Sequence, residues 1–145
     1  MRVHDLTLLG LLAGAPPLHS QAVPLDTTPV AVVQRFVDGA NARDLNAMMS
    51  MVAPDAVFAP LPAAEPLAIG RDSVQAFYRR ILATLPAKLR VTVESRMSDG
   101  SFVVDREHFT ESGAQRRDHA TWIYQVRGGL IRRAWVLREQ NAITR

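Results

Sequence analysis

The first half of the chain repeats its hydrophobic positions with the period of an α-helix. Apolar residues recur at positions 30, 33, 37 and 40, with Phe36 beside them, directly after Thr28-Pro29. A hydroxyl followed by proline is typical of a helix start, so this segment predicts a first helix. Asp44 is placed to cap a second, short helix that carries apolar residues at 45, 48, 49 and 52 on one side. Residues 53–55 are expected to end it.

The clearest helical period lies further along the chain. Gly70 precedes apolar residues at positions 74, 77, 78, 81, 82 and 85, and Pro86 is expected to end this third helix. Between the second and third helices, residues 56–58 predict a short strand. That strand leads into a loop broken by prolines from Pro60 to Pro66.

From Leu89 onward the hydrophobic period changes from 3.6 to 2, which indicates strands with one buried face. Turn signals at 98–100, 111–113 and 127–129 divide this half into four predicted strands, the last three at 102–110, 118–126 and 130–138. Three helices with one short strand among them, followed by a four-stranded meander, predict an α+β fold. We expect the helices to pack on one face of a curved antiparallel sheet.

Composition narrows the classes of protein that this fold can belong to. The 145 residues, 48% of them hydrophobic, suffice for one domain with its own core and exclude a second full domain. The absence of cysteine excludes disulfide scaffolds, thiol nucleophiles and thiolate metal sites. The net charge is only +3, and no aromatic residues for base stacking accompany the arginine pairs at 116–117 and 132–133. A nucleic-acid partner is therefore not expected.

The N-terminus has the pattern of a secretory leader. Arg2 precedes an apolar run at residues 6–15, and small residues at 20 and 22 resemble a cleavage site. We expect a signal peptide at 1–22 cleaved after Ala22, a linker at 23–28, a domain at 29–141, and a secreted or periplasmic location. An unprocessed N-terminus would instead imply the cytoplasm. The apolar run is too short to span a bilayer, so stable membrane insertion is not expected.

Several short segments resemble a known superfamily. They are VVQRFV at 32–37, NARDL at 41–45, PDAV at 54–57, IGR at 69–71 with Val74, Phe77 and Tyr78, and GGLI at 128–131. Together with the element order, they are similar to the cone-shaped superfamily of nuclear transport factor 2, the ketosteroid isomerases and the SnoaL-like polyketide cyclases. The resemblance covers nearly all of residues 29–139 and implies a cone-shaped sheet, a deep apolar pocket and a homodimer. This fold hosts enzymes, binding modules and transport factors alike.

The resemblance allows the ketosteroid isomerase chemistry to be checked residue by residue. That chemistry uses an aspartate base, a tyrosine hydroxyl and a protonated aspartate. In this sequence the tyrosine falls on Phe36, the base falls in the loop at Ala59-Pro60, and the protonated aspartate falls near Trp122. Isomerisation by that set is therefore not expected. The Asp-Arg-Asp set of the related limonene epoxide hydrolases is not supported either, because its last aspartate falls near Val136.

The predicted strand at 102–110 carries the candidate chemistry. Its pleat places Asp105, Glu107 and Phe109 on one face, which the resemblance turns toward the pocket. Two carboxylates about 7 Å apart at Cα on a buried face would split their pKa values, so that one acts as a base and the other as an acid. Asp105 and Glu107 are accordingly the predicted catalytic residues.

The predicted substrate-binding residues are mostly aromatic and would form the pocket wall. Among them, an arginine would neutralise a carboxylate or hold an anionic substrate. They are Phe36, Phe58, Tyr78, Phe109, Trp122, Tyr124, Trp135, Val136 and Arg138.

Simpler interpretations of the same residues stay open. Asp105, Glu107 and Arg138 also fit a cross-strand ion pair without catalysis. His108 fits a surface or dimer contact, because it lies on the face opposite the carboxylates, and His119 fits a solvated strand end. A metal site formed by the two histidines and Asp118 is not expected, because the spacing matches no closed ligand pattern. No cofactor is predicted.

The sequence as a whole predicts an exported domain that binds a small apolar or amphipathic molecule in its cone. Acid–base catalysis of the isomerase, cyclase or lyase type is one interpretation of the pocket. The alternatives are a non-catalytic ligand-binding protein and a homodimerising interaction module.

Overall fold

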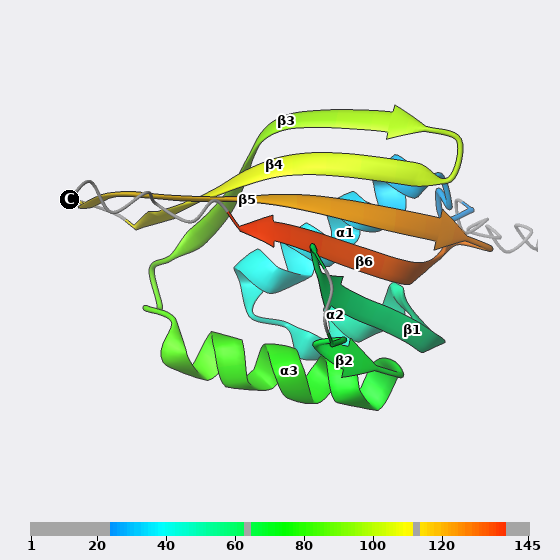
Figure 1. Ribbon diagram of the computed structural model, residues 1–145, viewed down its shortest axis with the longest axis horizontal. Helices are drawn as coiled ribbons and strands as arrows, with labels where there is room; N and C mark the ends of the chain where they lie inside the picture. Colours follow the sequence, from blue (N-terminus) through cyan, green and yellow to red (C-terminus); the bar gives the residue numbers. More distant parts are fainter. Residues whose placement is uncertain (1–23, 63–64, 112–113, 139–145) are drawn as a thin grey trace, which may run out of the picture.

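The computed structural model describes residues 24–62, 65–111 and 114–138, with side chains for all of these except 114–118 and 138 (Figure 1). The predicted leader at 1–22 and the last residues of the predicted domain, 139–141, lie outside this range. The described elements are α1 (Pro29–Ala42), α2 (Leu45–Ser50), β1 (Val52–Pro60), β2 (Ala68–Ile69), α3 (Arg71–Thr84), β3 (Arg90–Asp99), β4 (Phe102–Glu111), β5 (Ala114–Arg127) and β6 (Leu130–Arg138).

The elements form the predicted α+β architecture, with the helices on one face of a curved sheet that does not close on itself (Figure 1). The strand order is β2-β1-β6-β5-β4-β3, and the pairs from β3 to β6 are antiparallel neighbours in the predicted meander. We call the face covered by the helices the inner face and the opposite one the outer face.

Two helix starts follow directly from the local sequence. The Thr28 hydroxyl accepts a hydrogen bond from the Ala31 backbone N–H at the start of α1, and the Asp44 carboxylate accepts one from Ala47 at 2.9 Å at the start of α2. Both side chains satisfy donors that the first helical turn leaves without a partner. These two predicted caps are confirmed.

The first strand differs from its prediction. Residues 53–55 were expected to end a helix, but β1 begins at Val52 and pairs in parallel with β6, at the far end of the chain. The register of this pairing shifts between Val52 and Val57, and Pro54, which has no N–H for a ladder, lies inside the irregular stretch. The pairing also lengthens the sheet to six strands with β2, which the sequence pattern did not predict.

The junction between α1 and α2 ties the helices to the edge of the sheet. The Asn41 side chain accepts from the Val91 N–H at 2.7 Å and donates to the Val91 carbonyl at 2.9 Å. These bonds satisfy backbone groups at edge strand β3. The neighbouring Arg43 guanidinium donates to carbonyls at the end of α3, including that of Leu85 at 3.1 Å. This short polar segment therefore fixes α1, α3 and β3 relative to one another.

The hydrophobic core lies between the inner face and the helices. On α1 its members include Val32, Val33, Phe36 and Val37, all buried, whereas the predicted core position Val30 is 38% exposed. The buried stripe of α1 is therefore rotated around the helix axis relative to the predicted one, so that it includes Val32 and leaves Val30 at the surface. Among the described residues, no helix is long and apolar enough to cross a membrane.

Candidate functional site

A cavity of about 450 Å³ opens between α1, α3 and the inner face of the sheet. Its size falls within the range of small-molecule pockets. Most of its wall is apolar or aromatic, and Glu107 is the carboxylic acid among its lining residues. The other residues that line the cavity are Phe36, Val37, Ala40, Tyr78, Ile81, Thr84, Leu85, Leu89, Val91, Phe109, His119, Ala120, Trp122, Tyr124 and Val136.

Aromatic rings hold one another in place along this wall. Phe36 meets Tyr78 edge to face, with ring centroids 5.4 Å apart, and Trp122 stacks on Tyr124 at 5.8 Å and 15°. Phe58 lies behind them, fully buried, with centroid distances of 6.1 Å to Phe36 and 6.3 Å to Trp122. Edge-to-face and stacked pairs add directional attraction to apolar burial, so the wall is largely pre-formed.

Asp105 is fully buried and forms a two-point ion pair with Arg96 on the adjacent strand. Arg96 Nε lies 2.7 Å from Asp105 Oδ1, and Nη2 lies 2.6 Å from Oδ2. The remaining guanidinium nitrogen, Nη1, donates to Gln34 Oε1 at 2.7 Å, and the Gln34 amide donates to Asp38 at 2.8 Å. The pair is thus anchored to α1. The hydrogen bond and charge of Asp105 raise the pKa of Arg96, so the arginine remains charged.

A β-bulge brings Arg96 to this position. Val93 pairs with Glu107, but the next pairs are Ser95 with Arg106 and Arg96 with Asp105, so β3 holds one extra residue at Glu94. If β3 paired without a bulge, Glu94 would lie opposite Arg106 and Ser95 opposite Asp105, because side chains alternate between the faces of a strand. The bulge therefore turns a cation inward where the simple alternation would place a serine.

Glu107 lies two residues along β4 from Asp105, and its surroundings are different. Its side chain is only 3% exposed, and Oε1 accepts a hydrogen bond from the Tyr124 hydroxyl at 3.3 Å. Burial, followed by the charge of Asp105, raises the pKa of Glu107 from its ordinary value of 4.5 to about 8. The Tyr124 hydrogen bond and the more distant Arg96 oppose that rise.

The two carboxylates therefore have separate chemical roles. Asp105 has a permanent cationic partner, while Glu107 is protonated at neutral pH and becomes a base at slightly alkaline pH. A buried acid with a pKa near the working pH suits proton transfer to or from a bound molecule. Burial, followed by the charge of Glu107, raises the pKa of Tyr124 well above its ordinary value, so its hydroxyl stays a hydrogen-bond donor.

Most of the predicted pocket residues do line the cavity. Among the predicted substrate-binding residues these are Phe36, Tyr78, Phe109, Trp122, Tyr124 and Val136, and of the two predicted catalytic residues it is Glu107. Asp105 does not belong to the cavity wall, because Arg96 and the neighbouring side chains bury it completely.

Two further predicted wall residues lie elsewhere. Trp135 and Val136 were both expected at the pocket, but adjacent strand residues point to opposite faces, and Val136 is the one that lines the cavity. Phe58 supports the lining rings from behind rather than joining them. The Arg138 side chain lies outside the described part of the chain. Asp105 does form a cross-strand ion pair, with Arg96 as its cation, while the predicted pairing with Arg138 lies outside the described side chains.

The sequence pattern missed Arg96 because it does not reveal the bulge. After Val93 the residues of β3 are almost all polar, so no alternation marks the extra residue. His108 lies on the face opposite the carboxylates, as predicted, directly across from His119 on β5. His119 is 24% exposed, which is less than its predicted place at a solvated strand end implies.

Comparison with known proteins supports this architecture. The model of the SnoaL-like domain family matches residues 33–134, which is more than half of the chain. A cystatin-fold protein from Novosphingobium aromaticivorans superimposes with a TM-score of 0.68 at 18% identity, over 77% of this chain and 98% of its own. IdmH from Streptomyces antibioticus, a candidate polyketide cyclase, gives 0.61 at 22% identity, over 77% and 91%.

A third similar structure is a candidate ketosteroid isomerase from Kribbella flavida. It superimposes with a TM-score of 0.63 at 19% identity, over 76% of each chain. No curated protein matches the sequence significantly. At these identities the structural likeness concerns the fold, while the family match covers helices, sheet and cavity wall together. The chain belongs to the SnoaL-like domain family.

Proposed function

We propose that this protein binds a small apolar or amphipathic molecule in its cavity and transfers a proton with Glu107. The observation that carries the proposal is a single carboxylic acid in an apolar cavity wall, its pKa raised to about 8. An apolar pocket with few polar groups favours a molecule of mixed character, oriented by one polar end.

Glu107 is the proposed catalytic residue. In its protonated form it donates to a carbonyl or similar oxygen, and in its ionised form it removes a proton from carbon next to such a group. Tyr124 holds Oε1 and supplies a second donor at the same wall. Asp105 and Arg96 act as positioning residues, because the negative charge of Asp105 helps to raise the pKa of Glu107. Similar structures named as candidate isomerases and cyclases are consistent with this chemistry.

A test of the proposal uses an enolisable aromatic ketone. With 2-tetralone in D₂O, proton NMR measures hydrogen exchange next to the carbonyl. We expect the protein to accelerate the exchange, with a rate that rises around pH 8 as Glu107 ionises. Glu107→Gln should lower the rate by about 100-fold or more, within the range for loss of a general base. The matched control is Glu65→Gln, which changes an exposed glutamate that lies outside both the cavity wall and the outer-face cluster.

Binding measured in parallel separates catalysis from simple capture. Quenching of tryptophan fluorescence reports whether the ketone enters the cavity beside Trp122. Binding without accelerated exchange in the unchanged protein would support the non-catalytic ligand-binding alternative. Equal exchange rates for Glu107→Gln and the unchanged protein would contradict the role of Glu107.

A second proposed property is homodimerisation through the outer face of the sheet. The observation that favours it is apolar exposure there: Leu137 is 39% exposed, although its neighbour Val136 is buried in the cavity wall. Light scattering at high protein concentration measures the mass directly. A monomer at all concentrations would contradict this property.

Export also stays a proposal, supported by the leader pattern at residues 1–22. The intact mass of protein recovered from an expressing cell tests it. Loss of those 22 residues is expected, and a mass that retains Met1 would contradict export.

A further inference from the structure

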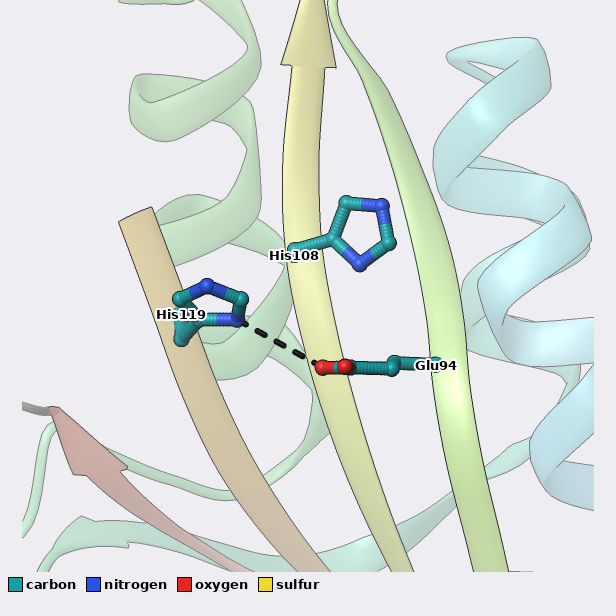
Figure 2. Close-up of side chains that lie close together, drawn as sticks. All are labelled: Glu94, His108 and His119. Carbon is teal, nitrogen blue, oxygen red and sulfur yellow. Dashed lines mark ion pairs between the residues drawn. The ribbon is translucent and has the colours of Figure 1, made fainter. Parts of the chain in front are cut away.

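Three potential metal ligands meet on the outer face of the sheet, and one of them, His119, is also among the residues that line the cavity. Glu94 from β3, His108 from β4 and His119 from β5 come from three adjacent strands, and Figure 2 shows their side chains converging. One ligand atom from each residue lies within 4.8 Å of the other two. His108 and His119 pair directly across β4 and β5, so the sheet itself holds the two imidazoles side by side.

The bulge in β3 supplies the third ligand. Glu94 follows the inward-facing Val93, so its side chain turns to the outer face, where Oε2 accepts from Arg106 Nε at 3.1 Å. The same carboxylate oxygen lies 3.7 Å from His119 Nδ1 (dashed line in Figure 2). Arg106 therefore orients the Glu94 carboxylate, whose second oxygen, Oε1, remains for another partner. Metal ligands are usually oriented in this way by hydrogen bonds from neighbouring residues.

The imidazole nitrogens provide an independent observation. His108 Nδ1 and His119 Nδ1 are both shielded from solvent, and neither has a hydrogen-bond partner among the described residues. Burying a polar nitrogen without a partner costs free energy. The two rings lie with centroids 5.9 Å apart and tilted by 58°, so they do not satisfy one another by stacking. A cation between them would satisfy both nitrogens at once.

We propose that Glu94, His108 and His119 form a binding site for a divalent transition-metal ion, of which Zn²⁺ is the expected occupant. Two imidazoles and one carboxylate suit zinc, whereas Mg²⁺ and Ca²⁺ prefer sites made of oxygen ligands. Tetrahedral bonds of about 2.0–2.1 Å place ligand atoms roughly 3.3 Å apart. The site therefore closes by rotation of side chains, chiefly of the half-exposed Glu94. Three protein ligands leave one position for water or a bound anion.

The test measures zinc binding by calorimetry after treatment with a chelator. The chain also contains His4 and His19 in its N-terminal segment, so the matched control is the double variant His4→Ala/His19→Ala. We expect that control to bind one zinc ion per chain. In the same background His108→Ala, His119→Ala and Glu94→Gln should each weaken binding by about tenfold or more, since even changes behind a ligand cost about 10–100-fold.

Further measurements identify the site and distinguish the loss of a metal ligand from a folding defect. Glu94→Gln alters an exposed carboxylate, so circular dichroism should match that of the control. Cobalt substituted for zinc should give the visible absorption of a four-coordinate ion in the control, with a changed spectrum in Glu94→Gln. If the His108→Ala and His119→Ala variants bound zinc as tightly as the control, the proposal would be overturned. One zinc ion per two chains would also overturn it, because two copies would then share the ion.

Discussion

The two faces of β4 carry similar residue types in very different surroundings. On the inner face Asp105 and Glu107 are 0% and 3% exposed, and each has a partner that the fold holds in place. On the outer face the Arg106–Glu94 pair has side chains 46% and 49% exposed. Burial is the largest cause of the raised pKa of Glu107, because desolvation on the inner face penalises its charged form.

The inner face itself contains a second contrast. Asp105 has two short bonds to an arginine, whereas Glu107 has one longer bond to a neutral hydroxyl. The charge that Asp105 keeps is one reason why Glu107 holds its proton. The difference shows how two carboxylates on one strand obtain separate roles from their neighbours.

The largest expected effect concerns the inner ion pair. Arg96→Met leaves the buried charge of Asp105 without a partner, which should lower the free energy of unfolding by about 3–5 kcal/mol in urea titration at pH 7. On the outer face Arg106→Met should cost less than about 1 kcal/mol, because water screens an exposed pair.

A double variant completes this test of the two faces. Arg96→Met with Asp105→Leu removes both charges and should recover most of the lost stability. Equal losses for Arg96→Met and Arg106→Met would show that the faces do not differ in the way described.

The next effect is a pH dependence of stability caused by Glu107. Because its pKa is raised from 4.5 to about 8 in the folded state, folding takes up a proton between these values, and stability falls as pH rises through that window. Glu107→Gln cannot ionise. It should match the unchanged protein at pH 4 and be more stable by as much as about 5 kcal/mol at pH 9, since the two pKa values differ by about 3.5 and one pKa unit corresponds to about 1.4 kcal/mol.

Unfolding in urea at pH 4, 7 and 9 measures this difference. Glu65→Gln changes an exposed glutamate and is the control, which should change stability by less than about 0.5 kcal/mol across the series. A Glu107→Gln variant with the same pH dependence as the unchanged protein would mean that Glu107 ionises normally.

The smallest expected effect comes from the hydroxyl that holds Glu107. Tyr124→Phe removes the hydrogen bond to Oε1, which should cost about 1 kcal/mol of stability. Because that bond lowers the pKa of Glu107, its loss should move the pKa further upward. Carbon NMR of the labelled Glu107 carboxyl follows the titration directly. A downward movement would show that Tyr124 favours the protonated form instead.

Much of the fold follows from local sequence, and the parts that do not are long-range. Thr28 and Asp44 cap their helices through bonds that span three residues, and β6 has the bounds that the turn signals predicted. The parallel pairing of β1 with β6 joins residues almost eighty positions apart, so no local pattern around Pro54 indicates it. Strand β2 forms only because β1 is already there to pair with it.

The candidate site also contains residues whose positions follow from local sequence and residues whose positions do not. The shared face of Asp105, Glu107 and Phe109 was predictable, because the pleat alone determines it. Arg96 was not, because its place depends on the bulge. Trp135 was expected beside Val136 at the pocket, and the pleat separates them.

The extra residue in β3 shows that the number of residues in a strand, as well as their identity, determines which side chains reach each face. The Arg96–Asp105 pair and the Glu94–His108–His119 cluster depend on this residue in different ways. Deletion of one codon, that of Glu94, would remove a proposed ligand on the outer face but leave Ser95 opposite Arg106 and Arg96 opposite Asp105 in a regular ladder. When relatives are aligned, a gap at this position therefore predicts loss of the outer cluster with retention of the Arg96–Asp105 pair, even where every other residue is identical.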